Sequence, residues 1–228
     1  MSGTSLDGID AVLAAFENNT CKLLHSQFIP FDEALRVELL ALNSAGANEL
    51  ERAALAANEL SRLYAAAIQA LLGKAEIRAA QVKAIGCHGQ TVRHRPDLGF
   101  TIQLANPALL AELTGLIVVA DFRSRDIAAG GQGAPLVPAF HAALFRHPER
   151  HRVIVNIGGI SNLTSLPPHG GVLGFDCGPG NLLLDAWTTQ HLGQPYDKDG
   201  AWAASGRPIP ELLRLPVWLY LRRDNQRG

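Results

Sequence analysis

Apolar residues recur along this chain with a spacing that changes repeatedly between the two-residue period of strands and the 3.6-residue period of helices. Residues 48–73 show the clearest helical spacing, and Asn48 followed by Glu51 predicts a capping box at the start of that helix. The other elements expected in this half are strands at 9–16, 21–31, 82–86, 100–104 and 117–122 and a helix at 107–113. Strands that alternate with helices in this way predict the α/β class.

A polar turn at residues 147–151, with the sequence HPERH, separates this first series from a second one. The pattern then predicts a helix from residue 181 to about 190, preceded by strands at 152–158, 160–166 and 172–177. Each half opens with a strand, a loop rich in glycine and small polar residues, and a second strand. We therefore predict two related domains, one at residues 1–150 and one at residues 151–228.

The balance of charge argues against a nucleic acid or an anionic membrane as a partner. The chain of 228 residues has 20 Lys and Arg against 21 Asp and Glu, which gives a formal net charge of −1. No run of basic residues supplies the positive field that a polyanion requires. The 22 glycines exceed the usual background of about 7%, and this predicts tight turns or backbone that approaches a ligand closely.

The same residues set an expectation for the cellular location. The longest stretch without Asp, Glu, Lys or Arg, residues 153–175, is interrupted by asparagines and prolines, so it predicts no membrane span. Asp7 and Asp10 precede any basic residue, which is the reverse of a secretory signal. The three cysteines lack the spacing of a zinc site or a disulfide framework. We therefore expect a cytoplasmic protein.

Two loops have the composition of phosphate-binding turns. Residues 3–10 (GTSLDGID) carry small side chains whose amides and hydroxyls can face one point, and Asp7 can hold a magnesium ion or its water. The alternative is an ordinary hairpin turn with a helpful aspartate. A second loop, residues 158–162 (GGISN), opens the other half in the same manner. The pair favours a nucleotide held between two domains.

Asp176 lies in the segment GFDCGPGN, which places a carboxylate at the end of a strand and before a helix. In α/β sheets, such positions face the crevice where ligands bind. A carboxylate there can act as the general base of a kinase. Helix capping by Asp176 is the equally weighted alternative.

Two further strand ends carry polar side chains. His88 stands between two glycines in GCHGQT, where little side-chain packing is expected around it, and this leaves ligand binding and a structural role equally open. Arg123 and Arg125 follow the next strand, and pairing with Asp121 and Asp126 on the surface is their commoner role. The glycine cluster at 130–133 is either a substrate loop or a tight connection.

Taken in order, six segments resemble the anhydro-N-acetylmuramic acid kinases: MSGTSLDGID, GCHGQTVRH, ADFRSRDIAAGGQGAPLVPAF, NIGGISN, GFDCGPGNLLLDAW and DGAWAASG. The resemblance covers about residues 1–207. It implies the actin-like fold of sugar kinases and chaperone ATPases, in which two RNase H-like domains close over ATP. It also implies a reaction of cell-wall (peptidoglycan) recycling, in which 1,6-anhydro-N-acetylmuramic acid becomes N-acetylmuramic acid 6-phosphate while water opens the anhydro ring.

The resemblance assigns roles to residues by position. Asp176 is the implied base, and His88 and Arg123 are the implied sugar contacts, beside the magnesium role that the first loop suggests for Asp7. Arg123 suits the lactyl carboxylate of the sugar because a guanidinium can bind a carboxylate in a bidentate manner. The implied ATP contacts are Gly3, Thr4, Ser5, Leu6, Asp7, Gly8, Ile9, Asp10, Gly158 and Gly159. The implied partners are ATP and the sugar, and a homodimer is compatible with them.

Two departures from the family pattern concern the ends of the chain. Fewer strand residues precede Ser2 than in the family, and the agreement stops after Arg207, so that residues 212–228 match nothing in the family. We therefore expect an incomplete second domain without the adenosine-binding segment, as a frameshifted or truncated gene would produce. The alternative to a kinase is a catalytically inactive remnant that binds the sugar or a partner.

Overall fold

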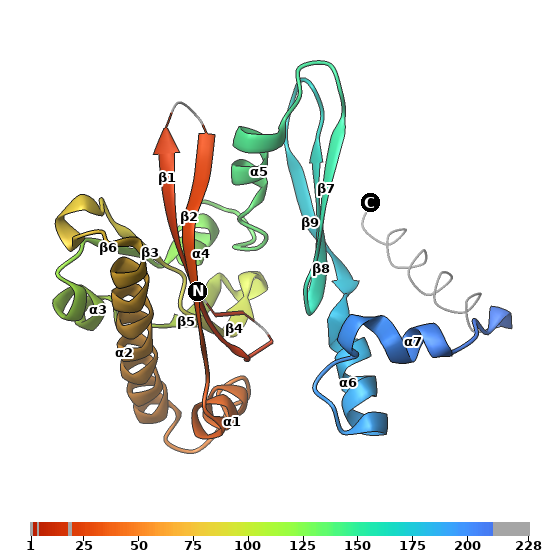
Figure 1. Ribbon diagram of the computed structural model, residues 1–228, viewed down its shortest axis with the longest axis horizontal. Helices are drawn as coiled ribbons and strands as arrows, with labels where there is room; N and C mark the ends of the chain where they lie inside the picture. Colours follow the sequence, from red (N-terminus) through yellow and green to blue (C-terminus); the bar gives the residue numbers. More distant parts are fainter. Residues whose placement is uncertain (1, 4, 18–19, 212–228) are drawn as a thin grey trace. The chain divides into compact units, whose positions relative to one another are not determined.

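The computed structural model describes residues 2–3, 5–17 and 20–211 (Figure 1). Its contacts divide the chain into two compact units, Met1–Pro179 and Gly180–Gly228. The predicted boundary between two related domains near residue 150 stays a prediction. Within the described ranges, no helix is long and apolar enough to cross a membrane.

The chain begins with the predicted hairpin. Strands β1 (Gly8–Glu17) and β2 (Thr20–Pro30) pair in the antiparallel sense, with an irregularity in register after Leu13. Helix α1 (Glu33–Ala41) follows because the Asp32 carboxylate accepts a hydrogen bond from the Leu35 amide at 2.8 Å and caps the first turn.

Helix α2 (Glu49–Ala75) confirms the helix expected at residues 48–73 and runs beside the hairpin in Figure 1. Buried side chains recur along it every three or four residues, and they include Leu60 and Tyr64. The predicted capping box is wrong, because Asn48 has a left-handed backbone (φ 51°) and its side chain makes no capping hydrogen bond.

The remaining elements of the first series confirm the α/β class. They are η1 (Ala79–Gln81), β3 (Ile85–Cys87), β4 (Gln90–Arg95), η2 (Pro96–Leu98), β5 (Phe100–Leu104), α3 (Pro107–Thr114), β6 (Val118–Ala120), α4 (Phe122–Ala128) and α5 (Pro138–Phe145). Strand β3 pairs with β6 in parallel, and β4 pairs with β5 in the antiparallel sense. The core forms where the hairpin, α1, α2 and α3 meet, and its fully buried members include Ile9, Leu39, Leu60 and Leu110.

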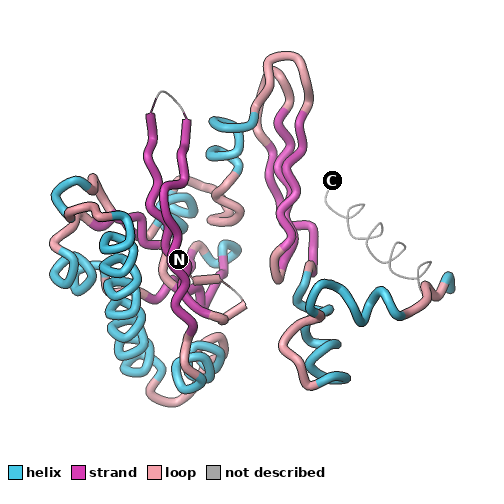
Figure 2. The backbone as a smooth tube through the Cα atoms, in the orientation of Figure 1, coloured by secondary structure: helices cyan, strands magenta, loops and turns pink. Residues whose placement is uncertain are grey.

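A three-stranded antiparallel meander completes the first unit, as Figure 2 shows. Its strands β7 (Arg152–Ile157), β8 (Ile160–Leu166) and β9 (Leu173–Pro179) confirm the three strands expected from the sequence. Helix α5 contacts the central strand β8, where the His141 ring lies 2.9 Å from the Thr164 hydroxyl.

The described part of the second unit contains α6 (Asn181–Leu192), η3 (Lys198–Gly200) and α7 (Ala201–Ser205). Helix α6 confirms the predicted helix from residue 181. The Asp197 carboxylate accepts hydrogen bonds from the Trp202 and Ala203 amides in the first turn of α7, and the His191 ring contacts both the Trp187 and the Trp202 rings. Residues 212–228, for which the sequence predicted a departure from the family pattern, lie outside the described residues.

Candidate functional site

The loop that precedes β1 makes hydrogen bonds to the rest of the fold at both of its ends. At the front, the buried Ser2 hydroxyl lies 2.9 Å from the Tyr64 hydroxyl of α2. At the back, the Asp7 carbonyl accepts a hydrogen bond from the Phe31 amide at 3.1 Å. Burial raises the pKa of Tyr64, so its phenol stays protonated and can take part in this hydrogen bond at neutral pH.

Only the first part of this predicted phosphate loop is open. A side chain on Gly3 would meet nothing within 4 Å, and Ser5 and Asp7 are exposed. Gly8 is different, because a Cβ atom there would lie 2.3 Å from the Ile29 carbonyl oxygen. Gly3, Ser5 and Asp7 can therefore approach a phosphate, whereas the glycine at position 8 is required by the hairpin.

The other predicted members of the loop have different surroundings. Leu6 is buried with a left-handed backbone (φ 52°), and Ile9 is fully buried within β1. Asp10 is exposed and lies opposite Phe28 in the hairpin register. Thr4 lies outside the described residues. Contacts to phosphate from Leu6 and Ile9 are thus restricted to their backbone atoms.

The hydrogen bond between Ser2 and Tyr64 leads to a stability prediction. Replacing Tyr64 by Phe leaves the buried Ser2 hydroxyl without its partner, so we expect unfolding by denaturant to show a loss of about 0.5–1.5 kcal/mol. Ser2→Ala should cost a similar amount. The double variant should cost less than the sum of the two, because neither unpaired group then remains. Additive losses would show that the two hydroxyls do not interact.

The second predicted phosphate loop, Gly158 and Gly159, joins β7 to β8. The strands pair up to the loop, with Ile157 opposite Ser161. A side chain on Gly158 would make only one ordinary contact, 3.6 Å from the Ile160 carbonyl oxygen. The backbone at Gly158 is therefore open to a ligand, as at Gly3.

The two predicted sugar contacts touch each other. Arg123 Nε donates a hydrogen bond to His88 Nε2 at 2.8 Å, and Arg123 Nη1 donates to the Gly133 carbonyl oxygen at 2.6 Å. The Gly133 amide in turn donates to the Asp126 carboxylate at 2.7 Å. Arg123 and Asp126 can both reach Gly133 because residues three apart lie on one face of α4. Arg123 therefore hydrogen-bonds His88 and Gly133, and surface pairing with Asp121 or Asp126 is not its observed role.

The hydrogen bonds of His88 define its protonation. Its Nδ1 donates to the Gly89 carbonyl oxygen at 2.7 Å, and its Nε2 must keep a lone pair to accept from Arg123. His88 is therefore neutral, in agreement with burial, which lowers its pKa with a smaller contribution from the Arg123 charge. Both ring nitrogens of His88 are occupied by hydrogen bonds. In this geometry His88 orients the Arg123 guanidinium.

The Asp176 carboxylate completes a cluster with His88 and Arg123. Asp176, on β9, lies close enough to Arg123 for its negative charge to oppose the effect of burial, which lowers the pKa of the guanidinium. Among the described residues, no group accepts from Arg123 Nη2. The cluster therefore presents unused guanidinium donors near an exposed carboxylate. Across the strand pair from Asp176, the buried Asn162 Oδ1 has no hydrogen-bond partner in the described part of the chain, so it is available as an acceptor.

Acid should weaken the fold through His88. In the unfolded chain this imidazole takes up a proton near pH 6.5, whereas the folded state resists protonation because its pKa is lowered. The unfolded state then binds more protons, so we expect the free energy of unfolding to fall as the pH drops below about 6.5. His88→Asn should show a shallower fall. An NMR titration in which His88 protonates at or above its ordinary pKa would contradict this prediction.

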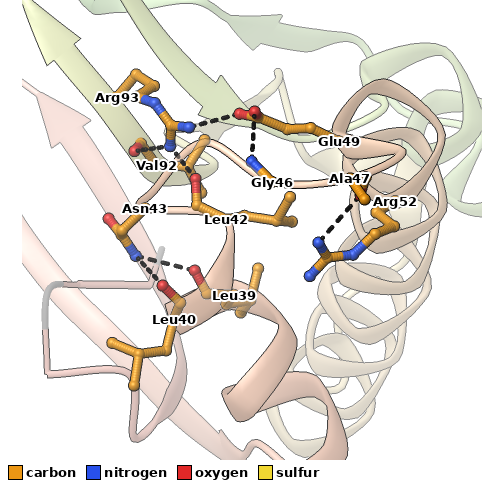
Figure 3. A network of polar contacts seen from close by, with 10 residues as sticks. All are labelled: Leu39, Leu40, Leu42, Asn43, Gly46, Ala47, Glu49, Arg52, Val92 and Arg93. Atoms are coloured by element: carbon orange, nitrogen blue, oxygen red, sulfur yellow. Dashed lines mark hydrogen bonds and ion pairs between the residues drawn. The ribbon is translucent and has the colours of Figure 1, made fainter.

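Arg93 holds strand β4 in place, as Figure 3 shows. Arg93 donates hydrogen bonds to the Glu49 carboxylate at the start of α2 and to the Leu42 carbonyl oxygen after α1. The Glu49 carboxylate also accepts from the Gly46 amide at 3.4 Å. These contacts join the α1–α2 connection to β4 and thereby fix the strand that borders the cluster.

Sequence reasoning missed His94, and it named Asp126 only as a surface partner of the arginines and Gly133 only as part of a glycine cluster. Gly133 has a left-handed backbone (φ 71°), and a Cβ there would lie 3.0 Å from the Ile127 side chain. The GGQG pattern was a signal for this glycine. Nothing in the sequence indicated that Asp126 accepts from its amide.

The described residues contain no group of three or more His, Cys, Asp or Glu side chains that could hold a metal ion by themselves. This arrangement is compatible with magnesium, which is commonly held by one or two carboxylates together with substrate phosphates and water. The Asp7 carboxylate accepts a hydrogen bond from the Ser5 hydroxyl at 2.7 Å and is exposed. It fits the role of that single carboxylate.

A family model and several curated relatives point to the same family. The family model of anhydro-N-acetylmuramic acid kinase matches residues 1–217, so the expectation that the resemblance stops after Arg207 is wrong. The anhydro-N-acetylmuramic acid kinase of Nitrosomonas europaea is 62% identical over 215 residues, which cover 93% of this chain and 59% of the relative. The protein of that name in Thiobacillus denitrificans is 60% identical over 94% of this chain and 57% of its own length. The protein of that name in Bordetella pertussis is 61% identical over 93% of this chain and 56% of its own length. The chain thus spans less than two thirds of these relatives.

Proposed function

Because the chain belongs to the anhydro-N-acetylmuramic acid kinase family, we propose that it is a cytoplasmic carbohydrate kinase that uses ATP to phosphorylate 1,6-anhydro-N-acetylmuramic acid. In this reaction water opens the anhydro ring, and the product is N-acetylmuramic acid 6-phosphate, an intermediate of peptidoglycan recycling. The proposed architecture is the actin-like fold, with an RNase H-like domain at residues 1–150 and part of a second one at 151–228.

The observation that carries this proposal is the position of Arg123 near Asp176. The substrate has a lactyl carboxylate, which requires a cation with unused N–H donors, and an anomeric carbon, which requires an activated water. Arg123 Nη2 supplies unused donors, and His88 and Gly133 hold the guanidinium from its other side. Asp176 supplies the carboxylate.

We assign the proton transfer to Asp176. Its carboxylate takes a proton from a water molecule as the water oxygen attacks the anomeric carbon, and the bond from that carbon to O6 breaks. O6 then attacks the γ-phosphorus of ATP, the bond to the β-phosphate oxygen breaks, and ADP leaves with the remaining negative charge. The proton on Asp176 passes to solvent after the reaction.

The open glycine loops are the proposed nucleotide contacts. Backbone amides of residues 3–10 and of Gly158 and Gly159 would face the phosphates, and the absence of side chains at Gly3 and Gly158 leaves room for their approach. Asp7 would hold Mg2+, which neutralises charge on the transferred phosphoryl group.

The proposed reaction can be tested in water enriched in 18O. We expect mass spectrometry to show a sugar 6-phosphate that carries one 18O atom, formed only when the protein, 1,6-anhydro-N-acetylmuramic acid and Mg-ATP are all present. A phosphorylated sugar without 18O would contradict hydrolytic ring opening. Sugar binding without any phosphorylation would contradict kinase activity and favour a binding role.

A further inference from the structure

One side chain beside the cluster has no role in the proposed function. His94, on β4, is solvent-exposed, and its ring is close enough to both Arg123 and Asp176 to interact with their charges. Its Nδ1 lies 3.1 Å from the Thr101 hydroxyl on the neighbouring strand β5. The question is which ring nitrogen of His94 carries the proton and which is available to a ligand.

The hydrogen bonds of the Thr101 hydroxyl show which ring nitrogen of His94 carries the proton. Its oxygen donates to the Arg93 carbonyl oxygen at 3.1 Å and accepts from Gln103 Nε2 at 2.7 Å. A hydroxyl has one hydrogen to donate and two lone pairs. Because its hydrogen is already used, the hydroxyl can only accept from His94, so Nδ1 of His94 carries the proton and Nε2 keeps a lone pair.

The second ring nitrogen is free within the described part of the chain. His94 Nε2 has no hydrogen-bond partner there, and the residue remains exposed. A Cβ atom on Gly133 would lie 3.3 Å from His94 Cε1, so the glycine lets the loop pack against the ring and restrict its orientation. Partial burial of the ring and the Arg123 charge lower the pKa of His94 against the smaller opposing effect of Asp176, and this favours the neutral imidazole.

We propose that His94 is a further sugar-binding residue, which accepts through Nε2 a hydrogen bond from a hydroxyl or amide N–H of the substrate. This inference rests on the proposed function. The anhydro-sugar offers such donors in its free ring hydroxyl and its acetamido N–H, whereas its lactyl carboxylate can only accept and is left to Arg123. His94 thus adds an acceptor to a cluster in which Arg123 supplies donors.

Two substitutions separate this role from a structural one. The amide of His94→Asn can keep the hydrogen bond to Thr101 but has no atom at the position of Nε2. His94→Gln places an amide near the position of Nε2. We expect calorimetric titration with 1,6-anhydro-N-acetylmuramic acid to show about ten-fold weaker binding for the Asn variant, the size of one lost hydrogen bond. The Gln variant should recover part of this loss, and ATP binding and the melting temperature should change little in both.

A spectroscopic measurement adds a readout that folding alone would not move. In the wild-type chain with labelled histidine, the 15N resonance of the unprotonated His94 Nε2 should shift when the sugar is added, because that nitrogen then accepts a hydrogen bond. If the wild-type chain does not bind the sugar, the proposed function fails. If it binds and the Asn variant binds equally well, or if the Asn and Gln variants are equally weak, the role of His94 is overturned and the proposed function stands.

Discussion

Asp176→Asn is expected to lower turnover of the anhydro-sugar by about 10²–10⁴-fold while the dissociation constants for the sugar and ATP stay nearly unchanged. The amide has nearly the same shape as the carboxylate, so binding contacts are preserved, but it cannot take the proton of the attacking water. The exposure of Asp176 on β9 means that the substitution should not disturb the core. Steady-state kinetics and calorimetry on the same preparation measure both quantities.

Asp97→Asn is the matched control, because Asp97 is an exposed aspartate whose carboxylate pairs with Arg95 on the surface. We expect it to retain the turnover of the wild-type chain. Turnover that survives in the Asp176 variant would remove this residue from the proton transfer. Equal losses in the two variants would point to a general effect of charge.

Gly8→Val is expected to destabilise the fold by about 3 kcal/mol or more, because it places a branched side chain inside a packed hairpin. The first atom added would lie 2.3 Å from the Ile29 carbonyl oxygen and 2.7 Å from the Phe28 ring. The sequence alone favours a different reading, in which this glycine gives room to a phosphate. The structure supplies a packing reason that acts whether or not ATP binds.

Gly3→Val is the matched control for this prediction. Nothing lies within 4 Å of the added atom, so unfolding by denaturant should show a change within about 0.5 kcal/mol. If Gly3 lines the proposed phosphate loop, the same variant should bind ATP more weakly and the sugar normally. A Gly8 variant as stable as the Gly3 variant would contradict the packing argument.

The elements that the sequence predicted are those whose pattern is local. The first hairpin, α2 and the meander β7–β9 each show apolar spacing that needs no partner to be recognised. Strand β4 was missed because its second half, Arg93 to Arg95, is entirely polar. It becomes a strand through its pairing with β5 and through the contacts of Arg93 to Glu49 and Leu42, which no periodicity indicates.

Sequence reasoning named some of the side chains that the structure brings together, but it could not indicate how they are arranged. Strand-end positions placed His88, Arg123 and Asp176 near one another, and the structure brings these side chains together. The hydrogen bond between His88 and Arg123 joins residues that are 35 positions apart, so only the folded chain reveals that one orients the other. His94 was missed for a similar reason, since its free nitrogen is defined by the hydroxyl of Thr101.

The most direct test of the sugar site is a crystal structure of this chain with 1,6-anhydro-N-acetylmuramic acid bound. The proposed site predicts that the lactyl carboxylate accepts hydrogen bonds from the outer nitrogens of Arg123, while His88 still accepts from Nε. It also predicts that the anomeric carbon faces Asp176 with room for one water molecule between them. A sugar bound away from Arg123 and Asp176 would contradict the assignment of this cluster as the sugar site.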